Sequence, residues 1–233
     1  MDHLASVPAV LGDEVSGRTL AVIGTGRIGK SVANKATAFD MDILCHDPAY
    51  QDEDFIEAIR SIMKVRHRER LSPRLQTIEY VSLEDALRRA DYVSLHVPLV
   101  WPGTAETPTY HLMNEERFGL MKPTAYLVNT SRGPVVDERA LAKVLAEGQI
   151  AGAALDVYET EPLPADSPLR DGSLRGALRL FPHAASAARA TRLSPDPDVG
   201  MAGRCVQAVI DVLEGNHNGD PGRMPFVVNK EAF

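Results

Sequence analysis

The sequence predicts an α/β fold built on a doubly wound parallel sheet. Short runs rich in β-branched and other apolar residues alternate with stretches of helical periodicity along most of the chain. A glycine-rich turn joins the first such run to the first helical stretch. Parallel strands need helical crossovers, and those helices cover both faces of the sheet. We therefore expect one sheet between two layers of helices.

The pattern begins with a strand expected at 19–23, the run Thr-Leu-Ala-Val-Ile. A helix through about residue 39 follows the glycine-rich turn. Its apolar side chains Ile28, Val32 and Ala36 recur at helical spacing, so we expect them to share one face. This strand, turn and helix form the first unit of the predicted sheet.

A longer helix is expected from Asp52 to Arg70. It begins with acidic residues and ends with basic ones, as the helix dipole favours, and Ser72-Pro73 stops it. The alternation then continues to the end of the sheet. The remaining strands are expected at 42–46, 77–81, 92–97, 125–129, 150–155 and 178–181, and the remaining helices from Ser82, at 115–121, between Asp137 and Gly148, and at 199–213.

The composition excludes several classes of protein. The chain has 233 residues, 44% of them hydrophobic, and a net charge of −7. Disorder is therefore excluded, and neither nucleic acid nor an anionic membrane is expected as a partner. The two cysteines, Cys45 and Cys205, lack the spacing of a disulfide framework or a zinc site, so no metal is expected. No apolar run approaches the roughly 18 residues of a membrane helix, and we expect a cytoplasmic protein.

The glycine-rich turn, Gly24-Thr25-Gly26-Arg27-Ile28-Gly29, is typical of dinucleotide binding because it follows a strand and opens a helix. Gly24 would allow the tight turn, Gly26 the approach of a pyrophosphate, and Gly29 the close packing of helix and strand. The helix N-terminus would offer N–H groups and a positive dipole end to the phosphates. A glycine triplet alone is also compatible with ordinary turn chemistry.

Asp47 favours the dinucleotide interpretation. It ends the second expected strand, about as far beyond the glycines as the acidic residue of dinucleotide-binding folds. A carboxylate at this place can accept both ribose hydroxyls and repels a 2′-phosphate, so the expected cofactor is NAD rather than NADP. The alternative is a turn-forming aspartate before Pro48.

Five stretches of the chain resemble the NAD-binding domain of the D-isomer-specific 2-hydroxyacid dehydrogenases. They are VIGTGRIG, ADYVSLHVPL, HLMNEERFGLMKP, LVNTSRGPVVDERALAKVLAEGQIAGAALDVYETEP and FPHAASA. They run in the family's order over about residues 14–215, and the long fourth stretch is the most specific. The resemblance implies a Rossmann-type fold, NAD as cofactor and a small-molecule 2-oxo or 2-hydroxy acid as substrate, and it leaves the individual acid open.

The resemblance also implies the catalytic residues, which are Arg132, Glu161 and His183. The Arg132 guanidinium would hold the carboxylate of a 2-oxo acid with two hydrogen bonds and polarise its carbonyl. His183 would serve as the general acid and base, and Glu161 would orient it. His96 also lies at the carboxyl end of an expected strand and is a rival on position alone, but it lies outside the stretch that matches the family's histidine.

Further residues implied by the resemblance surround the cofactor. Asp156 would hold the nicotinamide carboxamide, although an aspartate after a strand can also be a simple turn residue. The complete set expected to bind the cofactor is Gly24, Gly26, Arg27, Ile28, Gly29, Asp47, Val97, Pro98, Thr130, Ser131, Arg132, Asp156 and His183. All of these positions lie at or just after expected strand ends, where open α/β sheets bind ligands.

The resemblance implies a domain organisation. Residues 1–215 would form the NAD-binding domain, and 216–233 a C-terminal return segment that is a remnant of the substrate domain. The family's first substrate-domain segment is not recognisable before the glycine-rich strand. We therefore expect NAD binding with weak turnover, and a homodimer. A non-catalytic NAD(H)-binding or sensing module of the same family is the alternative, and a different Rossmann enzyme, such as a methyltransferase, is a third possibility.

Overall fold

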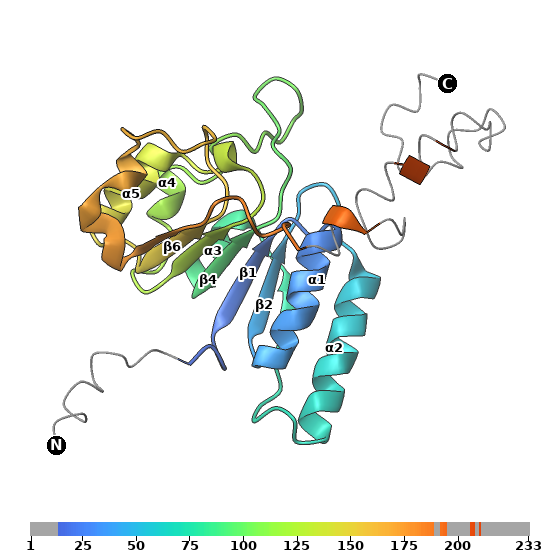
Figure 1. Cartoon of the computed structure of the whole chain (residues 1–233). Helices are drawn as coiled ribbons and strands as arrows, with labels where there is room; N and C mark the ends of the chain where they lie inside the picture. Colours follow the sequence, from blue (N-terminus) through green and yellow to red (C-terminus); the bar gives the residue numbers. More distant parts are fainter. Residues whose placement is uncertain (1–13, 189–191, 195–205, 208–209, 211–233) are drawn as a thin grey trace, which may run out of the picture. The chain divides into compact units, whose positions relative to one another are not determined.

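The computed structural model describes residues 14–188, 192–194, 206–207 and 210, in two compact units that divide after Phe181 (Figure 1). The first unit holds a seven-stranded sheet in the order β3-β2-β1-β4-β5-β6-β7, and every pair of neighbours is parallel. This arrangement confirms the doubly wound α/β fold. The strand order reverses between β1 and β4, which is where such sheets open a crevice for ligands.

The elements follow the predicted alternation closely. The strands are β1 (Thr19–Ile23), β2 (Asp42–His46), β3 (Ile78–Tyr80), β4 (Tyr92–Leu95), β5 (Tyr126–Asn129), β6 (Gly152–Leu155) and β7 (Leu178–Leu180). The α-helices are α1 (Arg27–Ala36), α2 (Glu53–Arg68), α3 (Leu83–Arg89), α4 (Glu115–Phe118) and α5 (Glu138–Ala146). Short 3-10 helices lie at Thr37–Phe39, Gly133–Val135, Pro168–Arg170 and Gly172–Gly176.

Two hydrophobic cores lie on opposite faces of the sheet. Along β1, Ala21 and Ile23 pack with residues of α3, α4 and α5, whereas Leu20 and Val22 pack with residues of α1 and α2. The alternation follows from the two-residue period of a strand, which points successive side chains to opposite faces. Figure 1 shows α1 and α2 lying across one face of β1 and β2. This double cover makes the strand ends the accessible part of the sheet.

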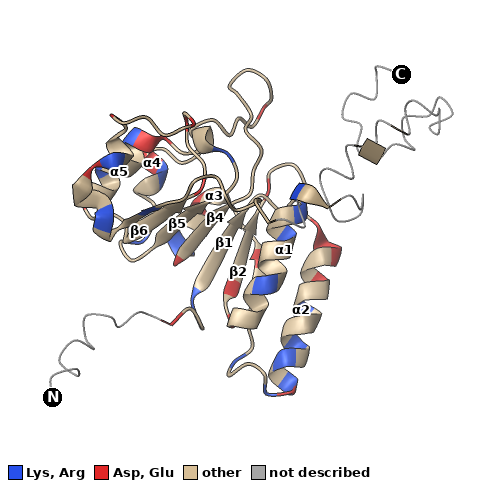
Figure 2. Cartoon of the chain, in the orientation of Figure 1, with Lys and Arg blue, Asp and Glu red and all other residues tan. Residues whose placement is uncertain are grey.

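Charge and capping explain the bounds of α2. The side chain of Asp52 caps its start by accepting a hydrogen bond of 2.9 Å from the Phe55 amide. The first turn is acidic and the last turn carries Arg66, His67 and Arg68, a separation visible in Figure 2. This polarity complements the helix dipole as the sequence predicts.

Several sequence expectations need correction or stay open. Ile28 does not join the buried face of α1, because its side chain is 68% exposed and Gly29, Ala33 and Ala36 are buried instead. The α-helix ends at Ala36, and the 3-10 helix Thr37–Phe39 carries the helical run to the expected residue 39. The strand expected to reach residue 97 ends at Leu95. The expected helix at 199–213 and the return segment at 216–233 lie almost entirely outside the described residues.

A loop at 98–110 follows β4, drawn in green in Figure 1. Its two ends are joined by Thr109, whose hydroxyl donates to the Pro98 carbonyl over 2.5 Å. Within the loop, the Trp101 ring stacks on the Tyr110 ring with 4.8 Å between centroids, yet half of the Trp101 side chain remains exposed. The loop is thus held by its own contacts rather than by burial in a core.

A carboxylate ties the strands together at the edge opposite their carboxyl ends. Asp91 accepts hydrogen bonds from the Thr19 amide at 2.9 Å and from the Lys122 ammonium at 2.8 Å. Burial alone would raise the pKa of Asp91, but the bonds from Lys122 and Thr19 outweigh burial and hold this pKa below its usual value. Asp91 therefore stabilises the fold in its charged form.

The substitution Asp91→Asn should lower the free energy of unfolding by about 1.5–3 kcal/mol at pH 7, the scale of a hydrogen bond to a charged group. A carboxylate with a depressed pKa contributes its stabilisation above its unfolded pKa of about 3.9, and this is lost as the pH falls through the lower folded value. The difference from the unmodified chain should therefore shrink at pH 3. Urea unfolding at both pH values measures it, and an equal loss at both would contradict the assignment.

The described residues offer neither a membrane-spanning helix nor a cluster of metal ligands. None of their helices is long and apolar enough to cross a membrane. Among the same residues, no group of three or more histidine, cysteine or acidic side chains is placed to hold a metal ion. Cys45 is a free thiol inside the core, and burial raises its pKa to about 12. That thiol is therefore unreactive at neutral pH.

Candidate functional site

The glycine-rich turn lies at the carboxyl end of β1, where its glycines meet close backbone contacts. Gly24 has a φ of +94°, and a Cβ atom there would lie 2.7 Å from the His96 carbonyl oxygen. A Cβ at Gly29 would lie 1.9 Å from the Gly24 carbonyl oxygen. Gly26 differs, because nothing lies within 4 Å of the place its Cβ would take. Two glycines thus permit packing within the protein, and the third leaves room beside the turn.

The residues beside Gly26 are open to a ligand. Gly26, Arg27 and Ile28 are all exposed, and the α1 N-terminus begins at Arg27. The first amides of a helix and its positive dipole end attract phosphate groups. The exposure of Ile28, which removed it from the predicted core, leaves an apolar side chain on the same open surface.

Asp47 lies at the end of β2 and is held by four donors. One carboxylate oxygen, Oδ2, accepts from the Thr25 amide at 2.9 Å and from the Thr25 hydroxyl at 3.3 Å. The other, Oδ1, accepts from the amides of Ala49 at 3.0 Å and Tyr50 at 3.3 Å. The carboxylate is thus fixed directly to the glycine-rich turn.

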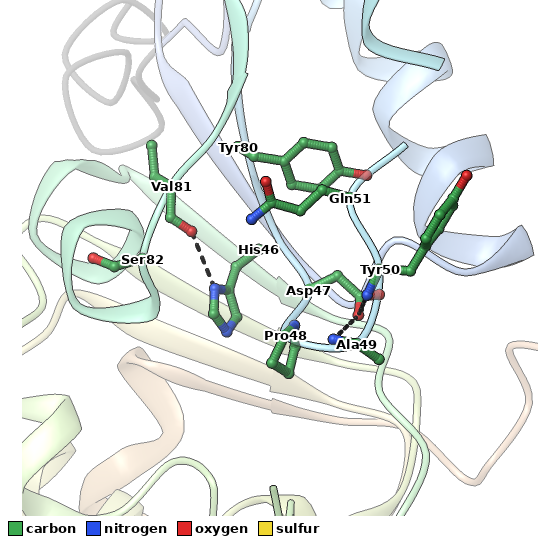
Figure 3. Close-up of a pocket in the computed structure, with 9 residues that line it drawn as sticks. All are labelled: His46, Asp47, Pro48, Ala49, Tyr50, Gln51, Tyr80, Val81 and Ser82. Carbon is green, nitrogen blue, oxygen red and sulfur yellow. Dashed lines mark hydrogen bonds between the residues drawn. The ribbon is translucent and has the colours of Figure 1, made fainter. Parts of the chain in front are cut away.

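A cavity of about 520 Å³ opens beside Asp47, between the ends of β2 and β3 (Figure 3). Polar atoms from both strand ends face it: His46 Nδ1 lies 3.1 Å from the Val81 carbonyl oxygen. The cavity is lined by His46, Asp47, Pro48, Ala49, Tyr50, Gln51, Tyr80, Val81 and Ser82. The cavity therefore lies next to the glycine-rich turn at the carboxyl end of the sheet, and mainly polar groups line it.

Arg132 follows β5 in a short loop that Asn129 organises. The fully buried Asn129 side chain donates to the Arg132 carbonyl at 2.9 Å and accepts from the Ser131 amide at 3.0 Å. The Arg132 side chain is exposed and donates to the Ser131 carbonyl at 2.7 Å. A buried amide thus shapes the backbone from which the guanidinium projects. Thr130, in the same loop, is exposed.

The segment with Arg132 packs against the segment with Glu161. A Cβ at Gly133 would lie 1.8 Å from the Tyr158 carbonyl carbon, so only glycine allows this approach. Glu161 in turn accepts a hydrogen bond from the Tyr158 amide at 3.1 Å. Glu138 adds a bridge, because its carboxylate accepts from the Glu159 amide at 2.7 Å. The structure therefore brings the backbone near Arg132 and the backbone near Glu161 into contact.

The other expected cofactor residues also follow strands. Asp156, directly after β6, is 5% exposed, and its amide donates to the Asn129 carbonyl at 3.0 Å. Val97 is buried beside Gly24, and Pro98 is exposed. With the glycine-rich turn, Asp47 and Arg132, these residues occupy the carboxyl ends of five of the seven strands. Their binding to a cofactor stays a prediction.

The two candidate histidines differ in their surroundings. His96 Nε2 lies 2.9 Å from the Ser94 hydroxyl, and burial lowers the pKa of His96, so the ring is neutral near pH 7. A neutral imidazole is a much weaker acid than an imidazolium, so His96 is the poorer candidate for the acid role. His183 belongs to the second unit, where it is exposed and its backbone has a left-handed φ of +54°. Its assignment as the acid and base stays a prediction.

Two residues of this site were not singled out from the sequence, Asn129 and Gly133. Both stand inside the stretch Asn-Thr-Ser-Arg-Gly that drew attention to Arg132. A buried asparagine at a strand end and a glycine after an arginine are the only local signals. Their partners, the loop amides and the backbone at Tyr158, become visible only in the folded chain.

Comparison with known proteins decides the family. Residues 5–185 match the model of the family described as D-isomer specific 2-hydroxyacid dehydrogenase, NAD binding domain. The chain belongs to this family. As a member of the D-isomer specific 2-hydroxyacid dehydrogenases, it shares their NAD-binding domain, in agreement with the seven-stranded parallel sheet and its glycine-rich turn.

Individual relatives of this dehydrogenase domain are similar over most of the chain. A glyoxylate reductase from Korarchaeum cryptofilum is 48% identical over 78% of the chain and 47% of its own length. One from Thermofilum pendens is 40% identical over 95% of the chain and 54% of its own length. The D-lactate dehydrogenase of Aquifex aeolicus, solved with NAD and lactic acid, has a TM-score of 0.69 and 32% identity over 92% of the chain and 59% of its own. The chain thus spans about half the length of the curated relatives it matches.

Proposed function

We propose that the chain binds NAD(H) and exchanges hydride between this cofactor and a 2-oxo or 2-hydroxy acid. The glyoxylate reductases among its relatives make glyoxylate the first substrate to test. The observation that carries the proposal concerns the carboxyl ends of the strands. An open, glycine-rich turn follows β1 and is suited to a dinucleotide. An exposed guanidinium follows β5 on the same side of the sheet and is suited to a carboxylate.

The residues present fit a dinucleotide. The empty space at Gly26 is what a pyrophosphate needs to approach the backbone, and the α1 N-terminus favours its charge. Asp47 can accept hydrogen bonds from ribose hydroxyls. These would replace its two longest hydrogen bonds, which come from the Thr25 hydroxyl and the Tyr50 amide. NADH, when bound, supplies the hydride for reduction of the substrate.

Arg132 would bind and orient the substrate. Its planar guanidinium can donate two parallel hydrogen bonds to the carboxylate of a 2-oxo acid, which fixes the adjacent carbonyl in one direction. The same charge draws electron density toward the carbonyl oxygen. Because Asn129 and Gly133 hold the loop backbone, the part of the chain that carries Arg132 needs little reorganisation on binding.

His183 would move the proton. In reduction its imidazolium donates a proton to the carbonyl oxygen as the carbon is reduced, and in oxidation its neutral ring removes the hydroxyl proton. Glu161 would accept a hydrogen bond from the other ring nitrogen and keep the ring oriented. Glu161 is exposed and accepts a hydrogen bond from the Tyr158 amide.

A two-stage assay tests the proposal. NADH binding is first measured by fluorescence titration, and glyoxylate, pyruvate and hydroxypyruvate are then added while NADH consumption is followed. Binding with turnover supports the dehydrogenase. Binding without turnover of any acid would favour the alternative, an NAD(H)-binding or sensing module, and absence of binding would overturn both.

The substitution Asp47→Ser should reduce the preference for NADH over NADPH by about tenfold, because it removes a ribose acceptor and its repulsion of a 2′-phosphate. Lys30, on the first turn of α1, is engaged by the Asp52 carboxylate, and that hydrogen bond raises the Lys30 pKa. Because Lys30 is already paired with Asp52, we do not expect it to attract the 2′-phosphate of NADPH once Asp47 is replaced. The ratio of dissociation constants for NADH and NADPH measures the effect. Asp91→Asn is the control, because it removes a carboxylate at the amino ends of the strands, away from the glycine-rich turn. An unchanged ratio in Asp47→Ser would count against the assignment.

We further propose a homodimer in the cytoplasm. Several large apolar side chains are well exposed among the described residues, including Phe39, Leu71 and Trp101, and a second copy could cover some of them. The free thiol of Cys45 fits a reducing compartment. Sedimentation velocity tests the first point, and fractionation of cells that express the chain tests the second.

A further inference from the structure

Tyr80 connects the cavity at the end of β3 with the glycine-rich turn. Its hydroxyl lies 3.0 Å from the Thr25 hydroxyl, although the two residues are 55 positions apart in the sequence. The same hydroxyl accepts a hydrogen bond of 3.1 Å from the Asp52 amide. Figure 3 shows the Tyr80 ring among the residues that line the cavity. One side chain thus contacts the turn after β1 and the start of α2.

The direction of each hydrogen bond follows from the donors available. A backbone N–H can only donate, so Asp52 N–H donates to the Tyr80 oxygen. A carboxylate can only accept, so the Thr25 hydroxyl donates to Asp47 Oδ2, 3.3 Å away, and its single proton is used there. The Tyr80 hydroxyl must therefore donate to Thr25 Oγ1. The result is a relay in one direction, from Asp52 through Tyr80 and Thr25 to Asp47.

We propose that Tyr80 is a positioning residue for the cofactor and acts through Thr25 and Asp47. This inference rests on the proposed NAD(H) binding. With the relay intact, the carboxylate and the turn are held in one orientation before the ribose arrives. Without the Tyr80 hydroxyl, the Thr25 hydroxyl can rotate away from Asp47, and the carboxylate must be ordered again on binding. Such ordering lowers affinity even though Tyr80 itself need not touch the cofactor.

Tyr80→Phe removes only the hydroxyl and tests the relay. We expect the dissociation constant for NADH to rise about three- to tenfold, the effect of losing one or two neutral hydrogen bonds. ADP-ribose, which keeps the ribose next to the adenine, should lose affinity by the same factor. Tyr126→Phe is the matched control. Tyr126 is the first residue of β5 and lies at the amino ends of the strands, away from the glycine-rich turn. Its NADH affinity should equal that of the unmodified chain.

A double-mutant cycle separates positioning from a general loss of structure. Thr25→Val removes the middle hydroxyl of the relay and keeps the shape of the side chain. If Tyr80 acts through Thr25, then Tyr80→Phe should change the NADH affinity of the Thr25→Val variant by less than about twofold. Thermal unfolding followed by circular dichroism checks that every variant is folded at the temperature of the titrations.

The outcomes are distinct. Multiplicative losses in the double variant, or an unchanged affinity in Tyr80→Phe alone, would overturn the relay while the proposed NAD(H) binding stands. Failure of the unmodified chain to bind NADH would overturn the proposed function and this inference together.

Discussion

Replacing Arg132 by lysine should lower kcat/KM for glyoxylate by about 100-fold or more. The charge is retained, but an ammonium cannot form the two parallel hydrogen bonds that align the carboxylate with the carbonyl, and misalignment of reacting groups is costly. A loss of this size corresponds to about 2.7 kcal/mol of transition-state stabilisation. NADH affinity should change much less, since the proposed carboxylate contact is to the substrate.

Binding of oxamate provides a measurement that does not depend on turnover. This unreactive analogue of a 2-oxo acid carries the same carboxylate, so its affinity for the chain saturated with NADH should also fall in Arg132→Lys. Arg88→Lys, an exposed arginine on α3, is the matched control and should leave both values unchanged. Equal oxamate affinity and equal kcat/KM in Arg132→Lys and the unmodified chain would remove Arg132 from the proposed site.

Replacing His183 by glutamine should lower the rate of reduction by about 100- to 10,000-fold, the contribution of a positioned acid or base. Reduction consumes a proton that His183 would donate, so in the unmodified chain its rate should fall as the pH rises. Oxidation needs the same residue as a base and should become faster as the pH rises. Both trends should disappear in His183→Gln.

His96→Gln distinguishes the two histidines. Because burial keeps the His96 ring neutral, its removal should leave the shape of the pH profile intact. A profile that vanishes in His96→Gln and survives in His183→Gln would reverse the assignment. Measuring oxidation and reduction at each pH guards against a change in stability that affects both directions alike.

The sheet could be predicted because its information is local. Most of the strands, such as β1 and β6, are short runs of mainly apolar residues, and the turns after them carry glycine, proline and capping residues. Ile28 was misassigned for a physical reason. Its spacing is that of a buried helix face, but it stands at the start of α1 beside an open turn, where nothing in the first unit covers it.

The contacts that organise the candidate site could not be predicted in this way. The approach of Gly133 to Tyr158 joins the loops after two neighbouring strands, and the relay from Tyr80 to Thr25 joins the first and third strands. Neither leaves a periodic pattern, because each depends on the order of strands in the sheet. The motifs identified candidate residues, whereas the tertiary structure was needed to find the groups that hold them.

The loop at 98–110 determines what an optical experiment on this protein will report. Trp101 is the single tryptophan of the chain, and it stacks on Tyr110 in that loop rather than inside either core. Its emission is therefore a local signal. It responds to breaking of the hydrogen bond from Thr109 to Pro98 that joins the ends of the loop, and only indirectly to unfolding of the sheet. A thermal transition followed by tryptophan emission that precedes the one followed by far-ultraviolet circular dichroism would reveal a loop that loosens before the domain unfolds.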